Sequence, residues 1–173
     1  MAVVEIALRT ILAVVFAVAF LSKVRSASAF GEFASSLGDI GWLPRPGRAG
    51  AARLIPLLEA AVVVLLAIPG TVAFGFGLGA LLLAGFTIVT GAEVAKGHRV
   101  RCRCFGASAA PIGPAQIARN IVLLAEALAG LVIEPISHGH ATAAALVLAF
   151  GLAVLAAVAL VRWDDLAFLV RTS

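Results

Sequence analysis

The segment "TVAFGFGLGALLLAGFTIVTGA" (Thr71–Ala92) contains no charged side chain. Because an α-helix rises about 1.5 Å per residue, a helix of this length crosses a hydrocarbon core about 30 Å thick. Ala141–Val161 is a second uncharged run of similar length. A backbone in lipid must satisfy its own hydrogen bonds, and a long, continuously apolar run does so as a helix. The sequence therefore predicts an all-α integral membrane protein.

The composition of the whole chain agrees with this class. Of its 173 residues, 62% are hydrophobic and 13% are charged, and the mean hydropathy is +1.12. Ordinary soluble domains are far more polar. The net charge is +4, but the chain has no Tyr and its basic residues lie mainly in loops, so no stacking surface for nucleic acid is expected. The expected surroundings are a lipid bilayer.

Five membrane-spanning helices are predicted. The first four form one domain, residues 1–135, and residues 136–173 add a fifth helix and a short tail. The Pro-Gly pair within Ile68–Thr71 predicts a tight turn between the second and third helices. The predicted spans are Val4–Ser22, Ala52–Ile68, Thr71–Ala95, Ala115–Ile133 and Ala141–Arg162.

Gly75 and Gly79 lie four residues apart in the third span. Glycine-rich loops that bind nucleotides follow a β-strand, and none is expected before these residues. Small residues at this spacing let two membrane helices approach closely. We therefore expect a helix–helix contact at these two positions.

A long connection, Lys23–Arg53, separates the first two spans. Phe30, Phe33 and Leu37 recur there at helical spacing among polar residues. This pattern predicts a short amphipathic helix at about residues 27–38, lying in the membrane interface with Trp42 as an anchor. The following "PRPGRAG" (Pro44–Gly50) is expected to be an irregular basic loop.

The chain has two cysteines, Cys102 and Cys104, within "KGHRVRCRCFG" (Lys96–Gly106). A disulfide between residues so close in sequence closes a small, strained ring, and strained disulfides are readily reduced. Positive charge stabilises the thiolate, which is the attacking form. The positive or titratable neighbours of the thiols are Lys96, His98, Arg99, Arg101 and Arg103. These features favour thiol–disulfide chemistry.

Two other roles for the cysteines stay open at this point. Two thiolates and the imidazole of His98 are acceptable ligands for a soft metal such as Cu(I). Alternatively, the cysteines are structural and inert, although inert cysteines are more typical of an apolar helix.

Ionisable residues within the spans form the second informative set. Glu59 lies midway along the second span and Glu126 midway along the fourth. An ionised side chain costs at least about 2.5 kcal/mol in the bilayer, so each should face the bundle interior and have a partner. Glu5 and Arg9, four residues apart, are expected to form an ordinary helix pair.

The fourth span carries a polar stripe that descends from the cysteine segment. Its members recur at helical spacing and so share one face of the helix. They are Gln116, Arg119, Leu123, Glu126 and Gly130, and Asn120 could join them. The stripe either relays protons or holds a quinone head group, or it is a buried polar network that fixes helix register.

These motifs together resemble one family. "RCRCFG" followed by "PIGPAQIARNIVLL", with "FLSKVRSASAFGEFASSLGDIGWLP" and "LIPLLEAAVVVLL" upstream, is similar to the methylamine-utilisation protein MauE family, a branch of the DoxX-like membrane proteins. The resemblance covers about Leu12 to Ile133. It implies a four-helix DoxX/MauE-like bundle, to which this chain adds the fifth, C-terminal helix. We expect this fifth helix to serve in partner docking or assembly.

The resemblance implies a function in disulfide chemistry on exported proteins, together with a thioredoxin-like partner. Cys102 and Cys104 would be the redox pair, with Phe105 and Gly106 shaping the turn. Lys23, Glu59, Arg119 and Asn120 would be supporting polar positions. No cofactor is certain, and a membrane quinone is a candidate by analogy of layout with quinone-linked four-helix proteins. The alternative is a non-enzymatic membrane scaffold for a soluble oxidoreductase.

Two arguments disagree on the side of the cell membrane that the cysteines face. Lys23–Arg53 holds five Lys or Arg residues and Lys96–Arg103 holds four, whereas the short connections opposite hold none. The positive-inside rule would place that side in the cytoplasm. Disulfide chemistry favours the exterior, where disulfides persist. We favour the exterior, because the basic residues beside the thiols have a chemical use.

Overall fold

The computed structural model describes residues 1–39, 44–96, 114–136 and 142–162, and every described element is a helix. Five helices are long and apolar enough to cross a membrane, which confirms an all-α integral membrane protein. The elements are α1 (Ala2–Val24), α2 (Ala27–Ser36), η1 (Leu37–Asp39), α3 (Arg45–Ala67), α4 (Val72–Ala95), α5 (Pro114–Ile133), η2 (Glu134–Ile136) and α6 (Ala143–Val161).

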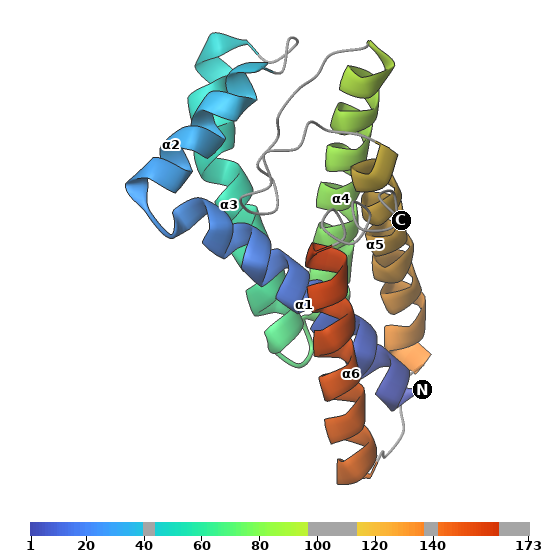
Figure 1. The fold of residues 1–173 in the computed structure, drawn as a ribbon. Coiled ribbons are helices and arrows are strands. Elements are labelled where there is room, and N and C mark those ends of the chain that lie inside the picture. The colour runs from blue at the N-terminus through green and yellow to red at the C-terminus, as the bar shows by residue number, and fades with distance from the viewer. Residues whose placement is uncertain (40–43, 97–113, 137–141, 163–173) are drawn as a thin grey trace, which may run out of the picture.

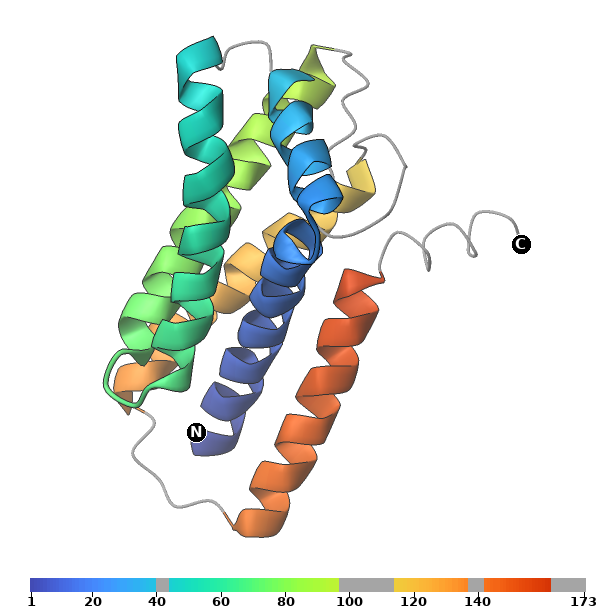
Figure 2. The same ribbon diagram turned by 90° about the vertical axis from the view of Figure 1, so that its left-hand side faces the viewer.

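Four of the long helices form a bundle (Figure 1). Around it, α1 packs against α3, α3 against α4, α4 against α5, and α5 against α1. The fifth long helix, α6, lies outside this bundle against α1 (Figure 2). Ala149, Ala153 and Ala157 are the buried residues of α6. Small side chains at every fourth position let the two helix backbones approach closely.

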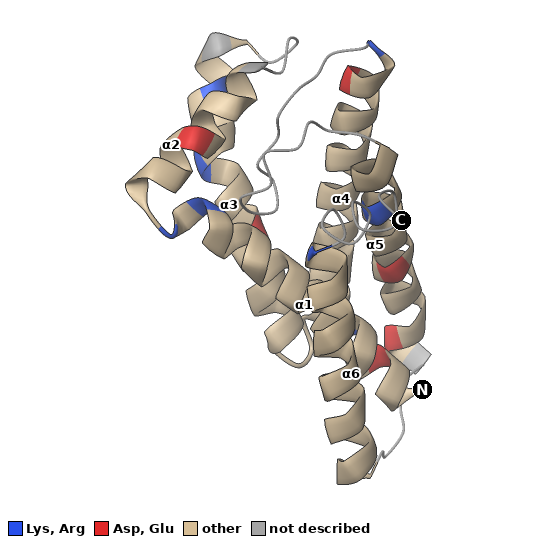
Figure 3. Ribbon diagram, viewed as in Figure 1, with Lys and Arg blue, Asp and Glu red and all other residues tan. Residues whose placement is uncertain are grey.

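The bundle has two unlike ends. At one end α1 leads into α2, and the flanks of the undescribed residues 97–113, Lys96 and Pro114, lie toward the same side (Figure 1). We call this the loop side. The N-terminus and the turn between α3 and α4 lie at the opposite end. Among the described residues, Lys and Arg gather toward the loop side (Figure 3). Arg9 is an exception, because it bonds to carbonyls at the end of α3 beside the turn into α4.

The helix α2 is confirmed, but its apolar face is covered by protein. Ser26 caps its N-terminus by accepting a hydrogen bond from the Ala29 N–H at 3.1 Å. Phe33 and Leu37 are buried together with Ala52 of α3 in a small apolar cluster, separate from the main core. The helical spacing of Phe30, Phe33 and Leu37 therefore predicted the amphipathic helix, and the structure shows that its apolar side chains pack against α3. Trp42 lies outside the described residues.

The expected irregular loop at Pro44–Gly50 is wrong, because α3 already begins at Arg45. Pro44 is the N-cap residue in extended conformation, and Pro46 lies in the first turn. The first N–H groups of a helix have no partner within it, so a proline there loses no hydrogen bond. The prolines mark the start of this helix and not a break before it.

The side chains of Arg9 in α1 and of Thr71 in the turn itself secure the connection between α3 and α4. The Arg9 guanidinium of α1 donates from Nε to the Leu66 carbonyl and from Nη2 to the Ala67 carbonyl, the latter at 2.9 Å. The Thr71 hydroxyl donates to the Leu65 carbonyl at 2.7 Å. Helix-terminal carbonyls otherwise lack partners, and a cation is favoured at that end of the helix dipole. Arg9 therefore does more than pair with Glu5, whose carboxylate lies 3.8 Å away.

Glycines allow close helix contacts in the apolar half of the bundle. A Cβ on Gly75 would lie 2.8 Å from the Leu66 side chain of α3, and one on Gly79 would lie 3.1 Å from Leu12 of α1. These contacts confirm the packing role expected for both glycines. Gly130 of α5 is tighter still, since a Cβ there would overlap the Phe76 ring of α4.

The Gly130→Ala variant should be destabilised, because the added methyl group meets a buried aromatic ring with no room to move. Overpacking of this kind costs about 1–3 kcal/mol. Gly85→Ala is the matched control, since a Cβ there meets no atom within 4 Å. Thermal unfolding of both variants in detergent measures the difference. Equal midpoints for the two variants would show that the contact between α4 and α5 is not tight.

Candidate functional site

Most of the predicted redox segment lies outside the described residues. Cys102 and Cys104 belong to this group, as do His98, Arg101, Arg103, Phe105 and Gly106. The structure does describe the helix ends on both sides of the segment, Lys96 after α4 and Pro114 at the start of α5. Both lie toward the loop side of the bundle (Figure 1). The described part of the candidate site therefore consists of the helices that carry this segment.

A buried ion pair joins α1 to α3 beneath the loop side. Lys23 Nζ lies 2.8 Å from Glu59 Oε1, and each side chain is 1% exposed. The same ammonium donates to the Ala19 carbonyl at 3.1 Å. The expectation that Glu59 faces the interior and has a partner is confirmed. Because both charges are removed from water, losing one would leave the other uncompensated.

The helix α2 covers this ion pair. Lys23 is the penultimate residue of α1, so the chain turns into α2 directly above it. The Phe33 ring of α2 is 1% exposed, and its centroid lies 5.2 Å from Lys23 Nζ. A cation over an aromatic face is attracted by the ring quadrupole. One ammonium therefore contacts three helices: its own α1, α3 through Glu59, and α2 through Phe33.

Further polar residues are buried in the same half of the bundle. Glu93 and Thr90 come from the last turns of α4, and Arg119 and Asn120 from the first two turns of α5. Each of the four bundle helices therefore contributes at least one polar side chain. We call the set the polar layer. Its members are Lys23, Glu59, Thr90, Glu93, Arg119 and Asn120.

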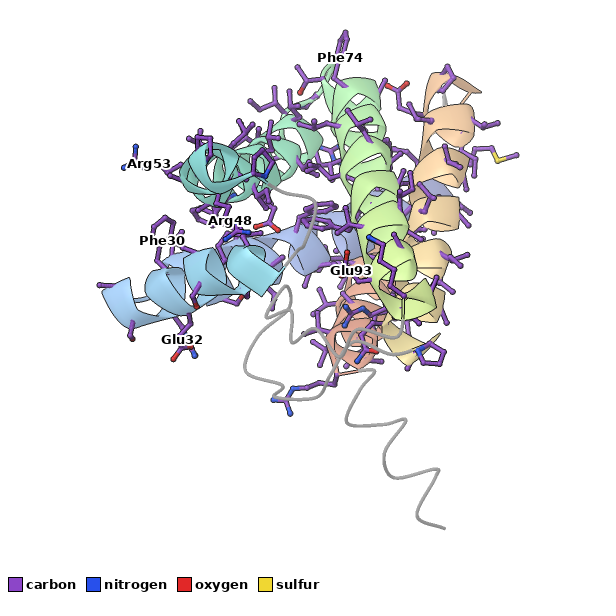
Figure 4. All side chains as sticks on the ribbon, turned by 90° about the horizontal axis from the view of Figure 1, so that it is seen from above. Phe30, Glu32, Arg48, Arg53, Phe74 and Glu93 are labelled. Atoms are coloured by element: carbon purple, nitrogen blue, oxygen red, sulfur yellow. The ribbon has the colours of Figure 1, made fainter. Side chains whose placement is uncertain are left out.

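Glu93 was not predicted from the sequence. It is 1% exposed, and its carboxylate accepts a hydrogen bond from Lys96 Nζ at 3.4 Å. Viewed from the loop side, its side chain points from α4 toward the bundle, whereas Arg53 points away (Figure 4). Glu93 follows Gly75 by about five full helical turns, so the two share one face of α4. This shared face with a packing glycine was the sequence feature from which the burial of Glu93 could have been predicted.

The polar stripe predicted on α5 is only partly buried. Arg119, Leu123 and Gly130 are buried on one face, and Asn120 is buried beside them. Glu126 is half-buried, and in the described part of the chain its Oε1 is buried with no hydrogen-bond partner. The partner expected for Glu126 is therefore not found among these residues. Arg119 is two turns away, about 10 Å along the helix axis, and the two side chains do not form an ion pair with each other.

The charges of the polar layer balance. Lys23 and Arg119 are cationic, and Glu59 and Glu93 are anionic. Ionisable residues in membrane helices are expensive to bury and therefore face a bundle interior, where they pair. The layer supplies buried donors and acceptors beneath the ends of α4 and α5, from which the cysteine segment departs. It can hold a polar ligand or stabilise charge on that side of the bundle.

Replacing one member of the Lys23–Glu59 pair should destabilise the bundle strongly. Lys23→Met or Glu59→Met leaves one buried charge without compensation, which costs about 3–5 kcal/mol. The double variant should recover most of that loss, because two apolar side chains of similar volume fill the same space. Arg53→Met is the control, since Arg53 is exposed. Unfolding midpoints of the four proteins in detergent test the pair, and additive losses in the double variant would contradict direct coupling.

Comparison with known proteins identifies the bundle. Residues 1–133 match the family model described as methylamine utilisation protein MauE. No curated protein and no solved structure matches the chain. The matched residues contain the whole four-helix bundle, the polar layer and the cysteine pair, and they end where α5 ends. Because the match covers well over half of the 173 residues, the chain belongs to the MauE family.

Proposed function

We propose that this membrane protein is a thiol–disulfide oxidoreductase or electron-transfer component. It works with a thioredoxin-like partner in the maturation of exported proteins, and Cys102 and Cys104 are its redox pair. The observation that carries the proposal is the placement of the only two cysteines, one residue apart, within the family-matched region and in a basic segment. A strained pair near positive charge suits exchange with another protein's thiols.

The reaction is a two-step exchange. A thiolate of the pair attacks one sulfur of a partner disulfide, which forms a mixed disulfide and releases the partner's other sulfur as thiolate. The second cysteine then attacks the mixed disulfide. This step forms the Cys102–Cys104 disulfide and releases the partner as a dithiol, so two electrons pass to the partner. The same steps run in reverse when the partner is the reductant.

Described features on the loop side support this chemistry. Lys96, at the start of the cysteine segment, is half-exposed and adds positive charge there. The polar layer lies beneath the helix ends that carry the segment. When the partner is the reductant, the pair is left as a dithiol, and a membrane quinone is the candidate terminal acceptor, since a dithiol and a quinone yield a disulfide and a hydroquinone with balanced protons and electrons.

The second candidate function is a membrane scaffold that positions a soluble oxidoreductase. The packing of α2 on the first half of α3 favours it. These helices form their own apolar cluster and extend beyond the end of α1 on the loop side (Figure 1). Their outward side chains include Glu32 and Arg53 (Figure 4). Such a projection can dock a partner whether or not the cysteines react.

Single serine variants should separate the two functions. If the cysteines exchange with a partner disulfide, the variant that keeps the attacking cysteine should accumulate a mixed disulfide, because the resolving thiol is missing. The measurement is a mass shift on non-reducing gels that disappears with reductant. The Cys102→Ser/Cys104→Ser double variant is the control and should trap nothing. If the partner protein is still fully oxidised and function is normal in the double variant, the redox function is contradicted and only the scaffold function remains.

The dithiol should face the exterior of the cell membrane, where disulfides persist. In intact cells, a membrane-impermeant thiol reagent should therefore label the reduced protein. The chain offers a clean test because it has no other cysteine. Labelling that appears only after lysis would place the pair in the cytoplasm, as the Lys and Arg distribution alone suggests.

A further inference from the structure

Two oxygen atoms in the polar layer are buried acceptors without donors. Glu59 Oε2 and Asn120 Oδ1 have no hydrogen-bond partner in the described part of the chain. Their residues are 1% and 4% exposed, so bulk solvent does not reach them directly. Glu59 belongs to α3 and Asn120 to α5, which lie diagonally across the bundle with α1 and α4 between them. Both buried side chains therefore face the interior of the bundle.

Leaving these acceptors unsatisfied would be expensive. A buried acceptor that loses its hydrogen bond costs about 1–3 kcal/mol, and more when it is charged. Lys23 satisfies the other carboxylate oxygen of Glu59, Oε1. Acyl chains of lipids carry no hydrogen-bond donor, so lipid cannot complete the site. The missing partner must bring donors of its own.

The chemistry of the site favours a small neutral donor. Lys23 already neutralises Glu59, and the layer as a whole holds two cations and two anions, so no net negative charge is left to attract a metal cation. Buried waters typically bind where two to four polar groups meet, and they satisfy such acceptors in protein interiors. Water fits both the charge balance and the burial of the two oxygen atoms.

We propose that water enters the loop-side half of the bundle and binds Glu59 Oε2 and Asn120 Oδ1. The path is short, because Lys23 is the penultimate residue of α1 and its pair with Glu59 therefore lies close to the end of that span. Water at Oε2 opens the Glu59 carboxylate to proton exchange with the loop side: hydronium gives its proton to Oε2 and leaves as water. The site does not depend on the cysteines or their reaction.

The opposite half of the bundle is apolar in the part of the chain that the structure describes. Its buried side chains are apolar and form one continuous core that includes Leu12, Phe16, Leu66 and Phe76. Phe33 and Phe16 then provide a matched pair of reporters. Each is a phenylalanine with 1% exposure, but Phe33 lies against Lys23 whereas Phe16 lies in the apolar core.

Radiolytic labelling of the full-length protein in lipid nanodiscs tests the proposal. An X-ray pulse generates hydroxyl radicals from bound water, and mass spectrometry locates the oxidised side chains. Phe33 should be oxidised about tenfold faster than Phe16, because only Phe33 has bound water nearby. In the Lys23→Met/Glu59→Met variant, Phe33 should fall to the rate of Phe16.

Equal rates at Phe33 and Phe16 in the unaltered protein would overturn the proposal, as would an unchanged Phe33 rate in the double variant. A rise at Phe16 in that variant would report unfolding. In that case Asn120→Leu, which removes one of the two acceptors, replaces the double variant, and the Phe33 rate should fall only part of the way toward that of Phe16. The readout contains no thiol chemistry, so loss of the exchange function and loss of the water site are distinguishable.

Discussion

The contact between Lys23 and Glu59 organises the loop side of this protein. At 2.8 Å, with both side chains 1% exposed, it fixes the end of α1 to the middle of α3. Two charges withdrawn from water are retained only when their geometry and hydrogen bonds compensate the desolvation. Here the Ala19 carbonyl and the Phe33 ring also contact the ammonium. The position of α2 therefore follows from that of the ion pair.

The bundle divides into halves held by different forces. Away from the loop side, helices approach through glycine, as at Gly75 and Gly130, and the core contains only apolar side chains. Van der Waals packing is the main attraction available between helices in lipid. Toward the loop side, each of the four bundle helices contributes a buried side chain to the polar layer, and Lys23 and Glu59 join α1 to α3. α6 packs its alanine face on α1, and its Leu160 and Val161 also pack against the apolar core.

Much of this fold follows from the sequence, because uncharged runs long enough to span a bilayer leave few alternatives in a membrane. A lone carboxylate in an apolar span, Glu59, was also informative, since burial without a partner is too costly. The resemblance implied Lys23 only as a supporting polar position, and its pairing with Glu59 was not predicted, because α1 and α3 meet through tertiary packing. Glu93 was missed because it lies near the end of a helix, where charged residues are common. Only its position on the same face of α4 as Gly75 indicates that it is buried.

The start of α3 and the surroundings of Glu126 could not be predicted, because they depend on tertiary contacts that the local sequence does not show. Pro44 and Pro46 read as a loop, yet a proline also starts helices, and only the packing of α3 against α2 decides between these. Glu126 was expected to have a partner, but the nearest cation on its face is two turns away. The role of Cys102 and Cys104 rests on their chemistry in sequence, since they lie outside the described residues.

The central claim is that Cys102 and Cys104 form a reversible redox pair. The most direct test is their midpoint potential in the full-length protein in nanodiscs, equilibrated with glutathione buffers and read by alkylation mass shift. The account predicts one two-electron transition in the range of catalytic disulfides, about −270 to −120 mV, toward the oxidising end because the ring is strained. Two thiols that stay reduced across that range would contradict it.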